Sequence, residues 1–191
     1  MGPTCVCGLS VTENCRDCDR HIFLKNTAAF PYQDMAQEII FRFKYGKKAF
    51  MAPGIARLMV ENVSPNIFQV DYIVPVPIHK NRLKKRGFNQ AQLLSKYIGK
   101  LVNKGHTKDL LVRVKDTKPL SNFTPKGREN TLKDAFSLKE KYCIADKKVL
   151  LIDDIFTTGA TLNACAQILY KHGAAEVNCL TFSAVPSTKQ A

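Results

Sequence analysis

The segment that most constrains the fold of this chain is KKVLLIDDIFTTGATL, which spans residues 147–162. Its residues 149–152 form a continuous apolar run, which is typical of a central parallel strand covered on both faces. Asp153 and Asp154 follow at the carboxyl end of this run. Because ligands of open α/β sheets bind at that edge, the segment predicts a doubly wound parallel sheet with a binding site beyond this strand.

The residues after the two acids favour a phosphate group. This phosphate loop consists of Thr157, Thr158, Gly159, Ala160 and Thr161. It leads into a predicted helix whose first backbone N–H groups attract an anion, and the threonine hydroxyls can donate to phosphate oxygens. A carboxylate can accept hydrogen bonds from the vicinal hydroxyls of a ribose, or hold a bridging Mg²⁺. The segment therefore predicts a site for a sugar phosphate.

Two other interpretations of the segment are weaker. In the first, the acids and threonines merely cap a helix, with Thr157 or Thr158 as the N-cap residue. In the second, the segment is the Walker B strand of a P-loop ATPase, but the GxxxxGK[ST] loop of such an enzyme does not occur in this sequence. The segment closely resembles the phosphoribosyl pyrophosphate (PRPP) motif of type I phosphoribosyltransferases. This resemblance implies a five-stranded parallel sheet, with Asp153 and Asp154 on the ribose hydroxyls and the phosphate loop on the 5′-phosphate.

Length and charge indicate one α/β domain, a small appendage and an anionic partner. A chain of 191 residues with 45% apolar content can bury one sizeable core. Its 29 basic and 16 acidic residues give a net charge of +13, more than solubility requires. The surplus indicates nucleic acid or an acidic membrane surface, unless it is only a solvated lysine-rich face. Without a leader or a membrane-spanning stretch, we expect a cytoplasmic protein.

The N-terminal segment is rich in cysteine. It holds Cys5, Cys7, Cys15 and Cys18. Four thiolates on two short turns are typical of a structural Zn²⁺, and disulfides are rare in the cytosol. His21 is an alternative to Cys5, because only one residue separates Cys5 from Cys7. We assign residues 1–25 to a zinc-binding module and residues 26–191 to the main domain.

Hydrophobic periodicity and turn residues predict the remaining elements. Helices are expected over residues 32–45, 52–60 and 89–102, and after Thr157. Strands are expected over residues 71–74, 110–114, 136–138 and 176–184. Residues 116–133 form a polar loop, which at that length is usually functional. The isolated Cys143, Cys165 and Cys179 are expected to be buried.

Several features together resemble one family. Residues 73–92 are IVPVPIHKNRLKKRGFNQAQ, and they resemble the ComF/GntX family of phosphoribosyltransferase-like proteins, in which a VPVP strand end leads through a basic segment to RGFNQA. A four-cysteine zinc module precedes the domain in that family, and the pair found here as Lys44 and Tyr45 recurs there. The resemblance covers essentially the whole chain. It implies a type I phosphoribosyltransferase-like parallel sheet with an N-terminal zinc-binding minidomain.

The resemblance also implies further binding residues. The turn around Val76 and Pro77 presents backbone amides to pyrophosphate, and Arg86 and Asn89 are candidates to contact the ligand. A basic hood over residues 113–136 carries Arg128, which can close over pyrophosphate and exclude water. The other cations of the cluster before Gly87 can face nucleic acid. They are Lys80, Arg82, Lys84 and Lys85.

Two functions of different class remain open. The first is an enzyme that uses Mg²⁺-PRPP to transfer a phosphoribosyl group to a nucleobase or a related acceptor. The second, which the resemblance implies, is the handling of incoming single-stranded DNA during natural transformation, with other DNA-uptake proteins at the inner membrane. In that case the same pocket binds PRPP or ribose 5-phosphate. The net charge of +13 favours the second function, because a nucleobase enzyme does not need it.

Metal analysis of protein purified without chelator tests the zinc prediction. We expect one Zn²⁺ per chain, held by Cys7, Cys15 and Cys18 with Cys5 as the remaining ligand. Cys15→Ser should lower solubility more than it affects the phosphate loop, because zinc binding and local folding are coupled. A purified protein without zinc would contradict this prediction.

Overall fold

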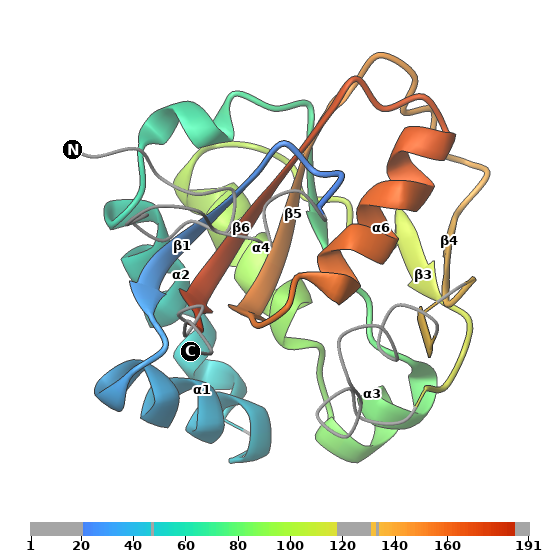
Figure 1. Ribbon diagram of the computed structural model, residues 1–191. Coiled ribbons are helices and arrows are strands. Elements are labelled where there is room, and N and C mark those ends of the chain that lie inside the picture. Colours follow the sequence, from blue (N-terminus) through green and yellow to red (C-terminus); the bar gives the residue numbers. More distant parts are fainter. Residues whose placement is uncertain (1–20, 47, 118–130, 133, 186–191) are drawn as a thin grey trace, which may run out of the picture.

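A parallel sheet forms the centre of the molecule. The computed structural model describes residues 21–46, 48–117, 131–132 and 134–185. The sheet contains β1 (Lys25–Pro31), β6 (Glu176–Ala184), β5 (Lys148–Phe156) and β2 (Tyr72–Pro75), side by side in that order (Figure 1). All three strand pairs are parallel, which confirms the predicted parallel α/β architecture.

Helices cover both faces of this sheet. One face carries α6 (Ala160–Lys171), and the other carries α1 (Asp34–Tyr45), α2 (Ala52–Glu61) and α4 (Gln90–Leu101) (Figure 1). Short 3₁₀ turns lie at η2 (Ala49–Met51) and η3 (Pro65–Phe68). No helix among the described residues is long and apolar enough to cross a membrane.

The apolar run of β5 is explained by its position between two cores. Val149 and Leu151 belong to the core under α6, whereas Leu150 and Ile152 pack with α2 and α4. All of these side chains are fully buried, and each contributes about 1.5–3 kcal/mol to folding. Between the exposed Lys148 and Asp153, the strand therefore has no position at which a polar side chain would reach water.

The resemblance implied a sheet of five strands, but the sheet of the described residues has four, so the predicted number of strands is wrong. A single parallel bridge joins His106 to Ile73, where a fifth strand would run, and Thr107 N donates to Ile73 O over 3.0 Å. The chain then leaves this edge. It forms β3 (Leu111–Arg113), which pairs antiparallel with β4 (Phe136–Leu138). Leu111 and Phe136 bury their side chains in the core under α6, and this packing takes β3 away from the sheet.

Most predicted elements agree with the structure to within two residues, but several features differ. β5 continues to Phe156, so the two acids lie within the strand and not beyond it; Asp153 is in register with Thr181 of β6. The strand β1 and the helix α3 (Lys80–Arg86) were not predicted. Cys143 is exposed, contrary to the expected burial, whereas Cys165 and Cys179 are buried.

The main domain begins near the start of the described chain. Phe23 is buried in the core under α6, and Leu24 N donates to Val177 O over 2.8 Å. The division between residues 1–25 and 26–191 stays a prediction, and the N-terminal cysteines lie outside the described residues.

Candidate sugar-phosphate site

The carboxyl ends of the parallel strands meet at one edge of the sheet and hold the candidate site. Pro75, the last residue of β2, is in register with Ile152, and Val76 N donates to Ile152 O over 2.9 Å. The chain leaves the sheet after this bond, whereas β5 continues beside β6. Asp153 and Asp154 therefore lie just beyond the end of β2, beside the turn that Val76 begins.

The two carboxylates leave β5 on opposite faces, as successive side chains of a strand do. Asp154 is buried, and its Oδ1 lies 2.9 Å from Nζ of Lys44 in the last turn of α1. Asp153 is half-buried on the face of the sheet that α6 covers, where its charge acts to raise the pKa of Arg113 and of Cys165. Its Oδ1 accepts a hydrogen bond of 2.9 Å from the backbone N–H of Asp154.

These surroundings shift the pKa values of Asp153 and Lys44. Burial and the charge of Asp154 raise the pKa of Asp153 to about 7. Burial alone would lower the pKa of Lys44, but the charge and hydrogen bond of Asp154 outweigh it and leave the pKa raised. Among the described residues, Asp153 has no ion-pair partner. The site therefore retains a carboxylate that can accept hydrogen bonds from ribose hydroxyls or contact a cation.

The middle residue of the phosphate loop is a glycine with no space for a side chain. Gly159 has φ +68°, and a Cβ added there would lie 2.5 Å from Cε1 of His21 and 2.9 Å from Cε2 of Phe156. Gly159 is also the N-cap of α6, so the alternative of Thr157 or Thr158 as N-cap is wrong. No side chain of the described chain caps this helix, which leaves its N-terminal end open to an anion. Ala160 and Thr161 form the first turn.

His21 closes one side of this loop. Its ring stacks on Phe23 at 4.8 Å and meets Phe156 edge-on at 5.6 Å. Ile22 N donates to Oδ1 of Asn163 in α6 over 2.8 Å. The first described residues therefore pack directly against the predicted phosphate site.

The side chain of Asn89 fixes the turn after β2. Its Nδ2 donates to Val76 O over 3.0 Å, and its Oδ1 accepts from Ala91 N over 3.1 Å as the N-cap of α4. Val76, Pro77 and Asn89 are all buried. Asn89 thus holds the turn at the start of α4, and both ends of its amide are engaged within the protein.

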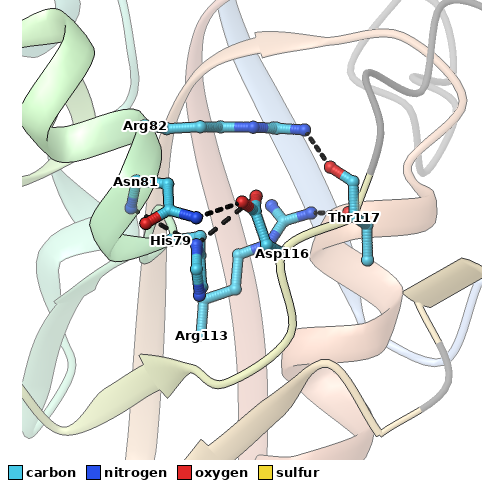
Figure 2. A network of polar contacts seen from close by, with 6 residues as sticks. All are labelled: His79, Asn81, Arg82, Arg113, Asp116 and Thr117. Atoms are coloured by element: carbon cyan, nitrogen blue, oxygen red, sulfur yellow. Dashed lines mark hydrogen bonds and ion pairs between the residues drawn. The ribbon is translucent and has the colours of Figure 1, made fainter.

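A polar network joins the start of α3 to the segment that follows β3 (Figure 2). Asp116 accepts from Nδ2 of Asn81 over 2.6 Å and lies 3.4 Å from Nδ1 of His79. Arg82 donates to Thr117 O over 2.6 Å. Burial, followed by the charge of Arg86, lowers the pKa of Arg82. The network fixes the point where the hood leaves the domain, while Arg128 lies outside the described residues.

Arg113 is a candidate that the sequence analysis missed. Its guanidinium lies over the ring of Phe136 at 5.3 Å and donates to the hydroxyl of Thr117. Its buried Nε has no hydrogen-bond partner among the described residues. Burial and the charge of Arg82 lower the pKa of Arg113, while Asp116 and Asp153 act in the opposite direction. An arginine that ends a strand immediately before a long polar loop was the available signal.

The predicted nucleic-acid cations do not all face the same way. Lys80, Lys84 and Lys85 are exposed on α3, whereas Arg82 points into the network of Figure 2. Arg86 is half-buried, with its guanidinium carbon 5.8 Å from the ring centroid of Tyr45. His79 is the N-cap of α3, and its Nδ1 accepts from Asn81 N; Gly87, with φ +85°, is the C-cap.

The chain matches a family of known proteins. The family described as "Phosphoribosyl transferase domain" matches residues 84–191, which contain α4, the phosphate loop and β6. The match covers more than half of the chain and includes both carboxylates.

Curated relatives match most of the chain. It is 33% identical to "Competence protein F" of Haemophilus influenzae over 73% of this chain and 63% of that protein. It is 29% identical to "Competence protein ComFC" of Bacillus subtilis, in a match that covers 94% of this chain and 75% of that protein. It is 26% identical to "DNA utilization protein YhgH" of Escherichia coli K12, in a match that covers 90% of this chain and 79% of that protein. The matched part thus spans less than two thirds of Competence protein F.

The stability of the protein without ligand should depend on Asp153. Because the folded state raises the pKa of this carboxyl, it binds the proton more tightly than the unfolded chain, and stability falls as the pH rises from about 4 to about 7. Asp153→Asn removes this loss, so its Tm should exceed that of the wild type at about pH 8 and match it near pH 4. Thermal unfolding across this range measures the difference. The exposed Glu140→Gln is the control, and an advantage of Asp153→Asn that is equal at both pH values would refute the assignment.

Proposed function

We propose that this chain, which belongs to the phosphoribosyl transferase domain family and to its ComF/GntX group, handles incoming single-stranded DNA during natural transformation and binds PRPP or ribose 5-phosphate. The protein acts in the cytoplasm, with other DNA-uptake proteins at the inner membrane as partners. The names of the relatives support this proposal, since two are competence proteins and one is a DNA utilization protein.

The convergence of three elements at one sheet edge supports the sugar-phosphate pocket best. The acids of β5, the uncapped start of α6 at Gly159 and the turn after β2 come together there. A free carboxylate suits ribose hydroxyls, and the start of α6 suits the 5′-phosphate. The turn at Val76 and Pro77 is placed for pyrophosphate, with Arg86 and Arg128 as the cations that approach it.

The carboxylates also fit the preference of Mg²⁺ for oxygen ligands. Among the described residues, no group of three or more His, Cys, Asp or Glu side chains gathers as a metal site. Asp154 is already paired with Lys44, so Asp153 is the carboxylate that would contact Mg²⁺ together with oxygens of the ligand. Bound Mg²⁺ neutralises part of the phosphate charge of PRPP.

The charge of the chain supports the nucleic-acid partner. The net charge of +13 exceeds what one PRPP would neutralise, and α3, with its exposed lysines, follows the turn at Val76 and Pro77 in the chain. Their contacts with phosphates would release counterions, which gives binding that depends on salt and little on sequence. The proposal also includes a zinc-binding module, formed by the N-terminal cysteines.

A phosphoribosyl transfer reaction is the second candidate, and one observation favours it. The half-buried Arg113, whose buried Nε has no partner in the described part of the chain, lies within the electrostatic reach of Asp153. Such a cation would stabilise pyrophosphate as negative charge develops on it during departure. The acceptor of the transferred group would then be a nucleobase or a related molecule.

Calorimetric titration with Mg²⁺-PRPP tests the pocket. Asp153→Asn combined with Asp154→Asn keeps the side-chain size but removes the charged acceptors. Because hydrogen bonds to charged groups contribute about 1.5–3 kcal/mol, the affinity should fall at least about tenfold. Zinc content should stay the same, and DNA affinity should stay the same or rise. Equal PRPP affinity in a folded double variant would remove the pocket from the proposal.

Salt dependence of DNA binding tests the α3 surface. Changing Lys80, Lys84 and Lys85 to Ala should reduce the slope of log affinity against log salt by about 2, since each lost phosphate contact on a single strand lowers it by about 0.7. Changing Lys96, Lys100 and Lys108 to Ala removes the same charge elsewhere and serves as the matched control. Equal slopes in the two triple variants would place the DNA surface outside α3.

A further inference from the structure

The last turns of α1 present two aromatic rings to solvent. Phe41 and Tyr45 lie one turn apart, each with 64% of its surface exposed, and their ring centroids are 5.1 Å apart. The core does not need them, because Ala36, Ile40 and Phe43 supply the buried face of this helix. Exposed apolar groups that gather in this way mark interaction surfaces.

One cation contacts the ring of Tyr45, and two more are exposed at the adjacent end of α3. The guanidinium of Arg86 lies over the ring of Tyr45 at 5.8 Å, and Phe43 packs against Phe88 at 5.6 Å. These contacts hold the end of α1 against the end of α3, where Lys84 and Lys85 are exposed. The nearby acid Glu38 is neutralised by Arg42, at 2.5 Å. The rings therefore lie beside a positively charged surface.

This surface adjoins the sugar-phosphate site. Lys44 reaches inward to Asp154, while the next residue, Tyr45, faces outward beneath Arg86. One turn of α1 thus contributes to the pocket and to the exposed surface.

We propose that Phe41 and Tyr45 form a stacking platform for the bases of single-stranded nucleic acid, with Lys84 and Lys85 on its phosphates. This inference rests on the proposed function and adds the place where bases are held. Aromatic rings beside cations suit single strands, because an unpaired base offers its face to a ring while its phosphate requires a positive charge. Duplex DNA offers the phosphates but keeps its bases stacked. A hydrophobic protein partner would not require the cations.

Binding of two oligonucleotides with equal charge separates stacking from electrostatics. Oligo(dT) of about 20 nucleotides and an abasic strand of the same length are titrated by fluorescence anisotropy. Phe41→Ala combined with Tyr45→Ala should weaken oligo(dT) binding at least about fivefold, since stacking is worth about 1–3 kcal/mol per base. Binding of the abasic strand should not change. Phe41→Tyr combined with Tyr45→Phe keeps both rings and should bind like the wild type.

Matched variants exclude general effects. Met35→Ala removes a side chain that is 73% exposed at the other end of α1, and it should leave both affinities unchanged. The chain has no tryptophan, so Tyr45→Trp supplies a single fluorophore that oligo(dT) should quench more than the abasic strand does. Leu101→Trp, on an exposed position at the end of α4, is the control and should show no base-dependent quenching.

The outcomes separate the two proposals. If the wild type binds neither strand, the proposed DNA function fails. If it binds both strands equally, or if the double Ala variant loses no affinity for oligo(dT), DNA binding stands and the platform is overturned. Base-dependent quenching at Leu101→Trp alone would move the platform to α4. A wild type that dimerises through this face, shown by a double Ala variant that is monomeric with unchanged DNA affinity, would also overturn it.

Discussion

Burial of β5 on both faces is the constraint on which the rest of the structure depends. Helices pack on each side of the strand, so its central residues are apolar without exception from Val149 to Ile152. After this run, the next polar side chains of β5 occur where β2 ends and one edge of β5 is released from the sheet. The site lies at that point because the apolar run leaves no place for charge in β5 between Lys148 and Asp153. The fold and the location of its chemistry thus have one cause.

The described residues at this edge of the sheet pair only one of the two carboxylates with a cation. Two adjacent carboxylates would repel each other, and Lys44 relieves one of them through its ion pair with Asp154. Asp153 remains with a raised pKa, caused by burial and by its neighbour. Such a group is stabilised when hydroxyls or a cation arrive, so part of the free energy of ligand binding comes from removing a cost already present in the free protein.

Local sequence patterns predicted the elements whose cause is local. The helix α4 has an apolar stripe and an Asn89 cap, and both are visible in the sequence. The helix α3 was missed because it is short, mostly charged and capped by His79, which is not a usual N-cap residue. The implied fifth strand failed because β3 is drawn to β4 by packing under α6, which no local pattern reveals. The same holds for the pairing of Lys44 with Asp154, since the two residues are far apart in the chain.

The position of Lys44 and Tyr45 in one turn of α1 has a thermodynamic consequence. A ligand that changes the charge at Asp153 also acts on Lys44, and through it on this turn and the ring that Arg86 covers. Thermodynamic linkage is reciprocal. If a bound sugar phosphate changes the affinity of the protein for single-stranded DNA by some factor, bound DNA changes the affinity for the sugar phosphate by the same factor. Under the two proposals above, a single helical turn would therefore connect the sugar-phosphate pocket to the stacking platform.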